Sequence, residues 1–277
     1  MNRAMLCLGV LGAFALYGAD DVSSGRLVRV GDHQLYVHCS GKPAKETVVL
    51  LNGLGAGLDV WKTVQTNIEG FARVCSYDRA GEGHSDKISH LQTPDEVVDD
   101  LSRLLEAEGA SRPYIVVGWS LGGIYARDFA QRFANLTAGI VLVDSAHEEQ
   151  FNRYAAISPA IAERYATQDG RFDRNAFLKA AGQLEPGKHL EWHLDVPLIV
   201  LEHKRRSGPA RTEQDRLAVD WHELQVDLAG RSKFGKLIEC RSGHMIATEQ
   251  PEIVVESIRD VIRQAGTLSR AASHHEL

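Results

Sequence analysis

A serine lies between two glycines where an apolar run meets a helical pattern. Residues 113–123 read Pro-Tyr-Ile-Val-Val-Gly-Trp-Ser-Leu-Gly-Gly. The β-branched run at 114–117 predicts a strand buried on both faces, and residues 124–130 predict a helix. The glycines of Gly-x-Ser-x-Gly permit a tight turn that leaves the hydroxyl of Ser120 exposed at the start of the helix, where free N–H groups favour an anion. Ser120 is therefore a candidate nucleophile.

Strand and helix patterns alternate on both sides of this serine. Two alternating runs around Gly31-Asp32 predict a β-hairpin over 27–38. Further strands are expected at 47–51, 72–78, 114–117, 138–143, 196–201 and 235–240, and helices near 60–68, 93–108, 124–130, 212–228 and 251–264. Thr93-Pro94-Asp95-Glu96 predicts a helix start, with an N-cap, a proline at the first helical position and acids in the first turn. This alternation predicts a mostly parallel sheet with helices on both faces.

Four stretches resemble the α/β-hydrolase superfamily, in the superfamily's order. They are Asn52-Gly53-Leu54-Gly55, the loop Asp-Arg-x-Gly-x-Gly-x-Ser at 78–85, the Gly-x-Ser-x-Gly turn and Ser242-Gly243-His244. The loop at 78–85 is a specific marker, and the turn resembles the nucleophile elbow of the serine esterases in this superfamily. The resemblance implies an eight-stranded, mostly parallel α/β-hydrolase sheet with helices on both faces and a small helical cap.

The resemblance also implies a domain organisation. The hydrolase core is expected at 25–144 and 195–265, and the polar, helix-prone stretch at 145–194 is expected to form the cap. Six apolar or aromatic cap residues are candidates for lining an acyl or alcohol pocket, although each also suits the cap's own core: Tyr154, Ile157, Tyr165, Phe172, Phe177 and Trp192. Residues 266–277 are expected to be a loose tail.

Ser120 requires a base to take its proton, and the base requires an acid to orient it. Of the twelve histidines, His244 stands where the superfamily places its base, and His84 is the second candidate. The usual acid position, after the strand at 196–201, holds Glu202. Asp144 instead ends the preceding strand, where some superfamily members carry the acid, so we expect a Ser120–His244–Asp144 triad with Glu202 as the alternative.

Two backbone N–H groups should form the oxyanion hole. The resemblance assigns them to Leu121, directly after the nucleophile, and to Leu54, in the loop after the strand at 47–51. Many relatives have His-Gly where this chain has Asn52-Gly53, a change that bears on support of the loop. Asp78 and Arg79 are interpreted as an ion pair or loop brace beside the site.

The first residues resemble a secretory signal peptide. Residues 1–3 carry a positive charge, 4–19 are uncharged and mostly apolar, and Asp20-Asp21 follows. We expect residues 1–19 to be a signal peptide of an exported protein, periplasmic or secreted; an uncleaved membrane anchor over 4–19 is the alternative. In the superfamily's strand order the strands of Cys39 and Cys75 are neighbours, which permits a disulfide, while two buried thiols are the alternative.

The sequence as a whole thus indicates a serine hydrolase that cleaves a carboxylic ester or lactone of a small or medium-sized molecule through an acyl-enzyme. An acyltransferase, a peptidase and a catalytically inactive binding protein on the same scaffold are the alternatives. A formal net charge of −6 without a basic cluster argues against nucleic acid as a partner. No cofactor or metal is expected, and the pattern leaves the oligomeric state open.

Overall fold

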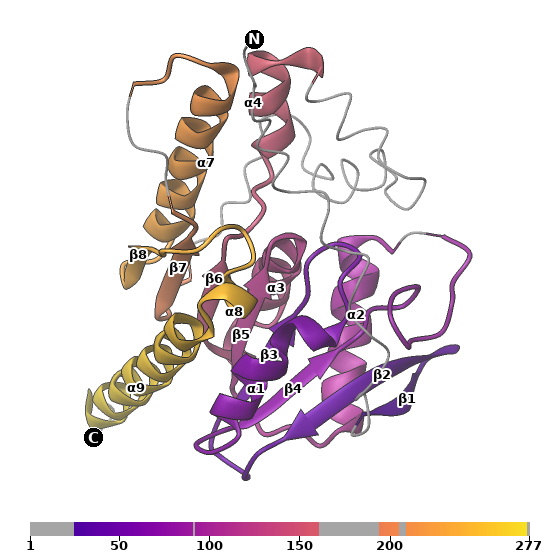
Figure 1. Ribbon diagram of the computed structural model, residues 1–277. Helices are drawn as coiled ribbons and strands as arrows, with labels where there is room; N and C mark the ends of the chain where they lie inside the picture. Colours follow the sequence, from indigo (N-terminus) through magenta and orange to yellow (C-terminus); the bar gives the residue numbers. More distant parts are fainter. Residues whose placement is uncertain (1–24, 91, 161–193, 205–208, 276–277) are drawn as a thin grey trace.

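The computed structural model describes residues 25–90, 92–160, 194–204 and 209–275 (Figure 1). The expected signal peptide and most of the expected cap therefore lie outside the described residues. No helix within the described ranges combines the length and apolar character needed to cross a bilayer.

An eight-stranded sheet forms the centre, in the order β1-β2-β4-β3-β5-β6-β7-β8. Its strands are β1 (Arg26–Val30), β2 (His33–Ser40), β3 (Thr47–Leu51), β4 (Arg73–Tyr77), β5 (Tyr114–Trp119), β6 (Thr137–Val143), β7 (Leu198–Glu202) and β8 (Gly235–Glu239). The strand β2 runs antiparallel to β1 and β4, and the other neighbours are parallel. The predicted sheet, including its hairpin at Gly31-Asp32, is confirmed.

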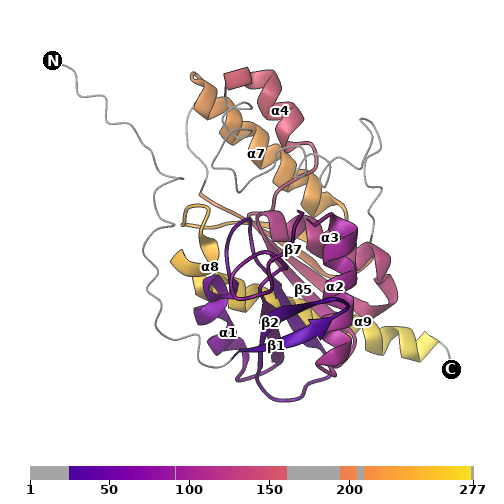
Figure 2. The same cartoon turned by 90° about the vertical axis from the view of Figure 1, so that its right-hand side faces the viewer.

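Helices cover both faces of this sheet. They are α1 (Lys62–Ile68), α2 (Pro94–Ala107), α3 (Leu121–Arg132), α4 (Gln150–Ile157), α7 (Glu213–Gly230), α8 (Ile246–Glu249) and α9 (Pro251–His275), with 3₁₀ turns η1 (Leu58–Trp61) and η2 (Ala134–Leu136). Figure 2 shows α1 and α8 on one side of the strands and α2 and α3 on the other. In both views α4 and part of α7 stand above the sheet.

Alternate residues of each central strand pack into two separate hydrophobic cores, one on each face of the sheet. In β3, Val49 and Leu51 pack with α2 and α3, while Val48 and Leu50 pack with α1, α8 and α9. All five residues of β3 are buried, as expected for a parallel strand covered on both faces. Each fully buried aliphatic side chain contributes about 1.5–3 kcal/mol relative to exposure, so the sheet is a rigid support for whatever its strand ends carry.

Helix α2 begins as its sequence predicts. Thr93 accepts a hydrogen bond from the backbone N–H of Glu96, and the Glu96 carboxylate accepts one from the backbone N–H of Thr93, forming a capping box with Pro94 at the first helical position. Thr212 and Asp215 form a second capping box at the start of α7.

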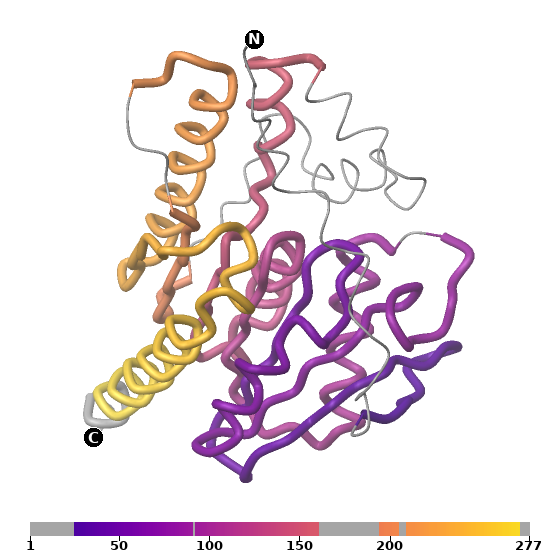
Figure 3. The backbone as a smooth tube through the Cα atoms, in the orientation of Figure 1, coloured from indigo at the N-terminus to yellow at the C-terminus, as the bar shows by residue number. Residues whose placement is uncertain are grey.

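The last helix is longer than expected. The prediction ended this helix at 264 and treated 266–277 as a loose tail, but α9 continues to His275 and runs outward from the sheet (Figure 3). Apart from Gly266, the residues from Ala265 to Ala271 do not break a helix, and alanine, leucine and arginine are strong helix formers. The single glycine is therefore too weak a signal to end α9.

Candidate active site

The turn between β5 and α3 presents Ser120. Its backbone has φ 52° and ψ −121°, a conformation that L-residues adopt only at a cost of about 1–3 kcal/mol. A Cβ at Gly118 would lie 2.4 Å from the carbonyl oxygen of Gly122, and one at Gly122 would lie 2.3 Å from that of Leu51. The two glycines of the motif are thus required by contact, as predicted, and the serine is left partly exposed.

Backbone hydrogen bonds hold the serine in this position. Its N–H donates to the carbonyl of Val143 at 3.1 Å, and its carbonyl accepts from Gly123 at 3.0 Å and Ala146 at 2.9 Å. The bonds to Val143 and Ala146 tie the elbow to the end of β6, which Asp144 follows directly. Leu121 is the first residue of α3, where backbone N–H groups have no partner within the helix.

Asp144 and His244 come together at the carboxyl ends of the strands. Asp144 is fully buried, and its Oδ2 lies 2.5 Å from His244 Nδ1. The Trp119 indole donates to the carbonyl of His244 at 2.9 Å, and the two rings lie 5.4 Å apart. Since Trp119 precedes Ser120, this contact fixes the His244 loop beside the elbow. The Nδ1 of His244 is engaged by the carboxylate, which leaves Nε2 as the ring nitrogen available to a hydroxyl.

Two more side chains donate to the same carboxylate. His203 Nδ1 lies 3.0 Å from Oδ1 and 2.9 Å from Oδ2 of Asp144, and Trp221 Nε1 lies 2.9 Å from Oδ1. Burial alone would raise the pKa of Asp144, but hydrogen bonds from His203 and His244 hold that pKa at about 2. The carboxylate is therefore ionised over the whole neutral range. Neither of these two donors was singled out from the sequence.

Glu202, the alternative acid, is placed elsewhere. It is buried at the end of β7, and its carboxylate lies 2.8 Å from Nδ1 of His222 on α7. Successive side chains point to opposite sides of an extended backbone, and it is His203, the residue directly after β7, that reaches Asp144. Among the described residues, the carboxylate that contacts His244 is that of Asp144.

The loop after β3 reaches the elbow from the other side. A Cβ at Gly53 would lie 2.8 Å from the Trp119 ring and 3.3 Å from Cβ of Ser120, so only a glycine permits this approach. Leu54 follows directly and is partly buried against the core. The Asn52 side chain donates to the carbonyl of Tyr77 at 2.8 Å, which supports the loop as its place in the sequence suggested.

Arg79 and Asp78 brace this loop, but not as a pair. The guanidinium of Arg79 donates to the carbonyls of Asn52 and Gly53, both at 2.6 Å, and pairs with Glu82 at 2.6 Å. Asp78 instead accepts from the backbone N–H groups of Leu58 and His84. The brace is present, whereas the expected Asp78–Arg79 pair is replaced by Arg79–Glu82.

His84, the second candidate base, lies with this brace. Its Nδ1 is 3.4 Å from Asp78, its side chain is exposed, and its ring lies 5.0 Å from that of Tyr36. The structure therefore places His84 with the loop and His244 with the elbow.

Only the first part of the expected cap is described. Helix α4 packs against α7 through a small cluster of apolar side chains: Tyr154, Ile157, Leu217 and Trp221. The remaining pocket-lining candidates (Tyr165, Phe172, Phe177 and Trp192) lie outside the described residues. Within the described chain, no group of three or more His, Cys, Asp or Glu side chains is arranged to hold a metal ion.

Comparisons with known proteins agree with this architecture. The sequence profile of the alpha/beta hydrolase fold family matches residues 46–191. The chain is 27 % identical over 234 residues to YqjL of Bacillus subtilis, described as uncharacterized, with 82 % of this chain and 89 % of that protein covered. It is 31 % identical over 122 residues to a pimeloyl-[acyl-carrier protein] methyl ester esterase of Vibrio vulnificus, covering 44 % of this chain and 46 % of that protein.

A solved structure with a similar fold is a thermophilic esterase from Thermogutta terrifontis. It aligns with a TM-score of 0.62 at 20 % identity and covers 88 % of this chain and 99 % of its own. The chain belongs to the α/β-hydrolase fold family. That membership, together with the esterase among its sequence relatives, supports an enzyme of the hydrolase class.

Proposed function

We propose that this protein is a serine hydrolase that cleaves a carboxylic ester or lactone of a small or medium-sized substrate. The observation that carries the proposal is the 2.5 Å contact between Asp144 and His244, held beside the Ser120 elbow by Trp119. Acyl transfer requires a nucleophile, a base that a carboxylate orients, and donors for the oxyanion. The corresponding parts here are a serine on a strained turn, an imidazole with one nitrogen on a buried carboxylate, and the glycine-containing loop after β3.

The first half of the reaction forms an acyl-enzyme. Ser120 Oγ attacks the ester carbonyl while Nε2 of His244 takes its proton, and Asp144 stabilises the imidazolium that results. The carbonyl oxygen becomes an oxyanion, to which the backbone N–H groups of Leu121 and Leu54 donate. The imidazolium then protonates the departing alcohol.

The second half releases the acid. A water molecule loses a proton to Nε2 of His244 and attacks the acyl group, and the serine leaves with that proton. Each oxyanion donor in such a site lowers the barrier by about 2.7–4 kcal/mol. The Arg79 brace on the carbonyls of Asn52 and Gly53 supports this role, because it leaves little freedom to the loop that carries Leu54.

A series of p-nitrophenyl esters from acetate to laurate tests the proposal, with wild type and four variants. Ser120→Ala and His244→Ala should remove nearly all turnover. Asp144→Asn should reduce kcat by about 10⁴-fold, whereas the matched carboxylate-to-amide variant Glu202→Gln should stay within about tenfold of wild type. Equal losses in the two amide variants would argue against Asp144 as the acid.

Labelling with a fluorophosphonate separates this proposal from a binding protein on the same scaffold. Wild type should be labelled on Ser120 and Ser120→Ala should not. Absence of both labelling and ester hydrolysis would overturn the hydrolase proposal. If instead Ser120 is labelled while every ester is inert, the triad acts on another acyl donor, and acyl transfer and peptide substrates would be assayed next.

We also propose that the protein is exported, with residues 1–19 as its signal peptide. The Cys39–Cys75 disulfide supports this, since disulfides persist mainly outside the reducing cytosol. N-terminal sequencing of the protein recovered from its native cells tests the proposal. A chain that retains residues 4–19 would favour the membrane anchor instead.

A further inference from the structure

Two imidazoles share the carboxylate of Asp144. His244 Nδ1 lies 2.5 Å from Oδ2, and His203 Nδ1 lies 2.9 Å from the same oxygen and 3.0 Å from Oδ1. The backbone N–H of His203 also donates to Oδ1 at 3.1 Å. Because an ionised carboxylate only accepts hydrogen bonds, Nδ1 of His203 and Nδ1 of His244 both donate to it. One imidazole is sufficient for the hydrolytic reaction, so the second requires an explanation.

His203 occupies a defined place in the fold. It follows β7 directly, next to Glu202 at the end of that strand, and Asp144, directly after the neighbouring strand β6, supplies the carboxylate. The indole of Trp221 lies near both rings, 6.0 Å from that of His203 and 6.2 Å from that of His244. On the Asp144 carboxylate, Trp221 and the backbone N–H of His203 donate to Oδ1, His244 contacts Oδ2, and the His203 ring lies within hydrogen-bond distance of both oxygens.

The charges around His203 favour its protonated form. Asp144 directly follows β6, Glu202 ends the strand that His203 follows, and Glu239 ends β8. Burial by itself lowers the pKa of His203, but the hydrogen bond and charge of Asp144, with the charges of Glu202 and Glu239, raise that pKa above its ordinary 6.5. The facing helix α7 contributes Trp221 and His222, and His222 pairs with Glu202.

We propose that His203 is a positioning residue that holds the Asp144 carboxylate for His244 and, when protonated, weakens proton uptake by His244. This inference rests on the proposed triad. The orienting part follows from the three bonds of His203 to Asp144. The charge part follows from the sharing of one carboxylate, because an imidazolium at His203 already compensates the negative charge that would otherwise stabilise an imidazolium at His244.

The sign of the pH effect follows from this competition. The base His244 must be neutral to accept the serine proton, so activity is lost on the acid side when His244 takes up a proton. With His203 charged, that uptake is disfavoured, and activity persists to lower pH. Removal of the charge leaves the whole Asp144 anion to His244, so the acid limb of the activity profile moves to higher pH.

The first experiment compares pH profiles of kcat/KM for wild type and His203→Asn. The asparagine amide occupies the position of Nδ1, so it keeps a neutral donor toward Asp144 and removes the titrating charge. We expect the acid limb to move up by about 0.5–1 pH unit, as a nearby charge in a partly buried site would require. An acid limb that is unchanged or moves down would overturn the charge part of the proposal.

A matched control is His222→Asn, the same change in a histidine that pairs with Glu202. Its acid limb should coincide with that of wild type. A second variant tests the orienting part: His203→Ala should lower kcat by about tenfold with little change in KM, the order expected for loss of a hydrogen bond to a charged group, and His203→Asn should restore most of that loss. If His203→Ala keeps full kcat, His203 does not orient Asp144.

An NMR titration of ¹⁵N-labelled imidazoles gives a readout that needs no substrate. In His203→Asn, the pH at which His244 takes up its proton should rise relative to wild type, and in His222→Asn it should not. If no ester is hydrolysed but this shift appears, the proposed function fails and the coupling of the two imidazoles stands. If esters are hydrolysed and the shift is absent, the function stands and the role of His203 is overturned.

Discussion

At the scale of single residues, backbone strain coincides with the proposed catalytic groups. Among the described residues, the two non-glycine positions with positive φ are Ser120, at 52°, and Asp144, at 44°. Such conformations cost about 1–3 kcal/mol each and persist where the surrounding structure enforces them. Here the enforcing contacts are the bonds of Ser120 to Val143 and Ala146, which connect the two strained turns.

Replacement of the nucleophile should reveal this strain. Ser120→Gly and Ser120→Ala both remove the hydroxyl, but glycine adopts a positive φ without a steric penalty. We expect Ser120→Gly to be more stable than Ser120→Ala by about 1 kcal/mol. Urea unfolding of the two inactive variants measures the difference. An alanine variant as stable as the glycine variant would show that the elbow relaxes without cost.

At the scale of elements, the site depends on a loop that is held by a neighbouring loop. Arg79 is buried and binds the carbonyls of Asn52 and Gly53. Glu82, its ionic partner, also accepts from the N–H of Gly55 at 3.1 Å. Arg79 and Glu82 therefore contact the loop on both sides of Leu54.

Arg79→Gln should disturb the proposed oxyanion hole without touching the triad. We expect kcat to fall by about 10–100-fold, less than the 10²–10³ that loss of a whole oxyanion donor costs, with a smaller change in KM. Glu82→Gln is the control: it keeps the bonds of Arg79 to the two carbonyls, and its loss should be clearly smaller. Full kcat in a folded Arg79→Gln protein would contradict the brace.

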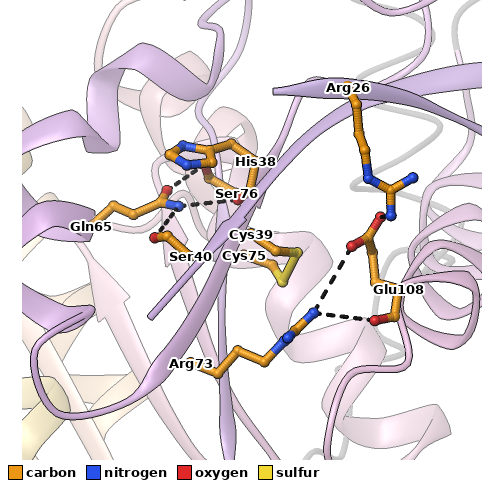
Figure 4. Close-up of a disulfide and its surroundings, with 9 residues drawn as sticks. All are labelled: Arg26, His38, Cys39, Ser40, Gln65, Arg73, Cys75, Ser76 and Glu108. Atoms are coloured by element: carbon orange, nitrogen blue, oxygen red, sulfur yellow. Dashed lines mark hydrogen bonds and ion pairs between the residues drawn. A yellow bond between two sulfur atoms is a disulfide. The ribbon is translucent and has the colours of Figure 1, made fainter. Parts of the chain in front are cut away.

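At the scale of the whole molecule, a disulfide joins the antiparallel part of the sheet to the parallel part. Cys39 on β2 and Cys75 on β4 lie opposite each other in register and are bonded. Figure 4 shows the disulfide beside polar contacts on both sides, with Gln65 reaching Ser40 and Ser76, and Glu108 between Arg26 and Arg73. Of the two readings that the sequence left open, the disulfide is the one present.

Removal of this disulfide should lower stability and leave catalysis intact. The bond closes a span of 36 residues, for which the loss of chain entropy in the unfolded state corresponds to about 3–4 kcal/mol. A Cys39→Ala, Cys75→Ala double variant should unfold at correspondingly lower urea, with kcat close to wild type while it is folded. The matched control is Cys240→Ala, which removes a buried thiol outside the disulfide. Reductant should lower the stability of this variant as much as it lowers that of wild type.

Local patterns in the sequence were sufficient for most elements. The cap at Thr93 and the glycine turn at Gly31 act within a few residues of chain, so their effects can be predicted without the fold. The boundary of α9 could not, because the helix-forming residues after Gly266 carry no strong stop signal. The ionic partner of Arg79 could not be predicted from the sequence either, since two acids, Asp78 and Glu82, lie within reach along the chain.

The sequence by itself determined the class of fold and the position of the serine on its turn, because the periodicity of strands and helices is local and the turn tolerates only glycine at 118 and 122. The histidine after the last strand was identified through the resemblance to the α/β-hydrolase superfamily. Only the tertiary structure decided which carboxylate meets His244. Asp144 directly follows β6 and Glu202 ends the adjacent parallel strand β7, and the choice depends on which side chain points toward the loop after β8. His203 and Trp221 reach Asp144 from 59 and 77 residues away, and contacts over such distances exist only once the sheet has brought the strand ends together.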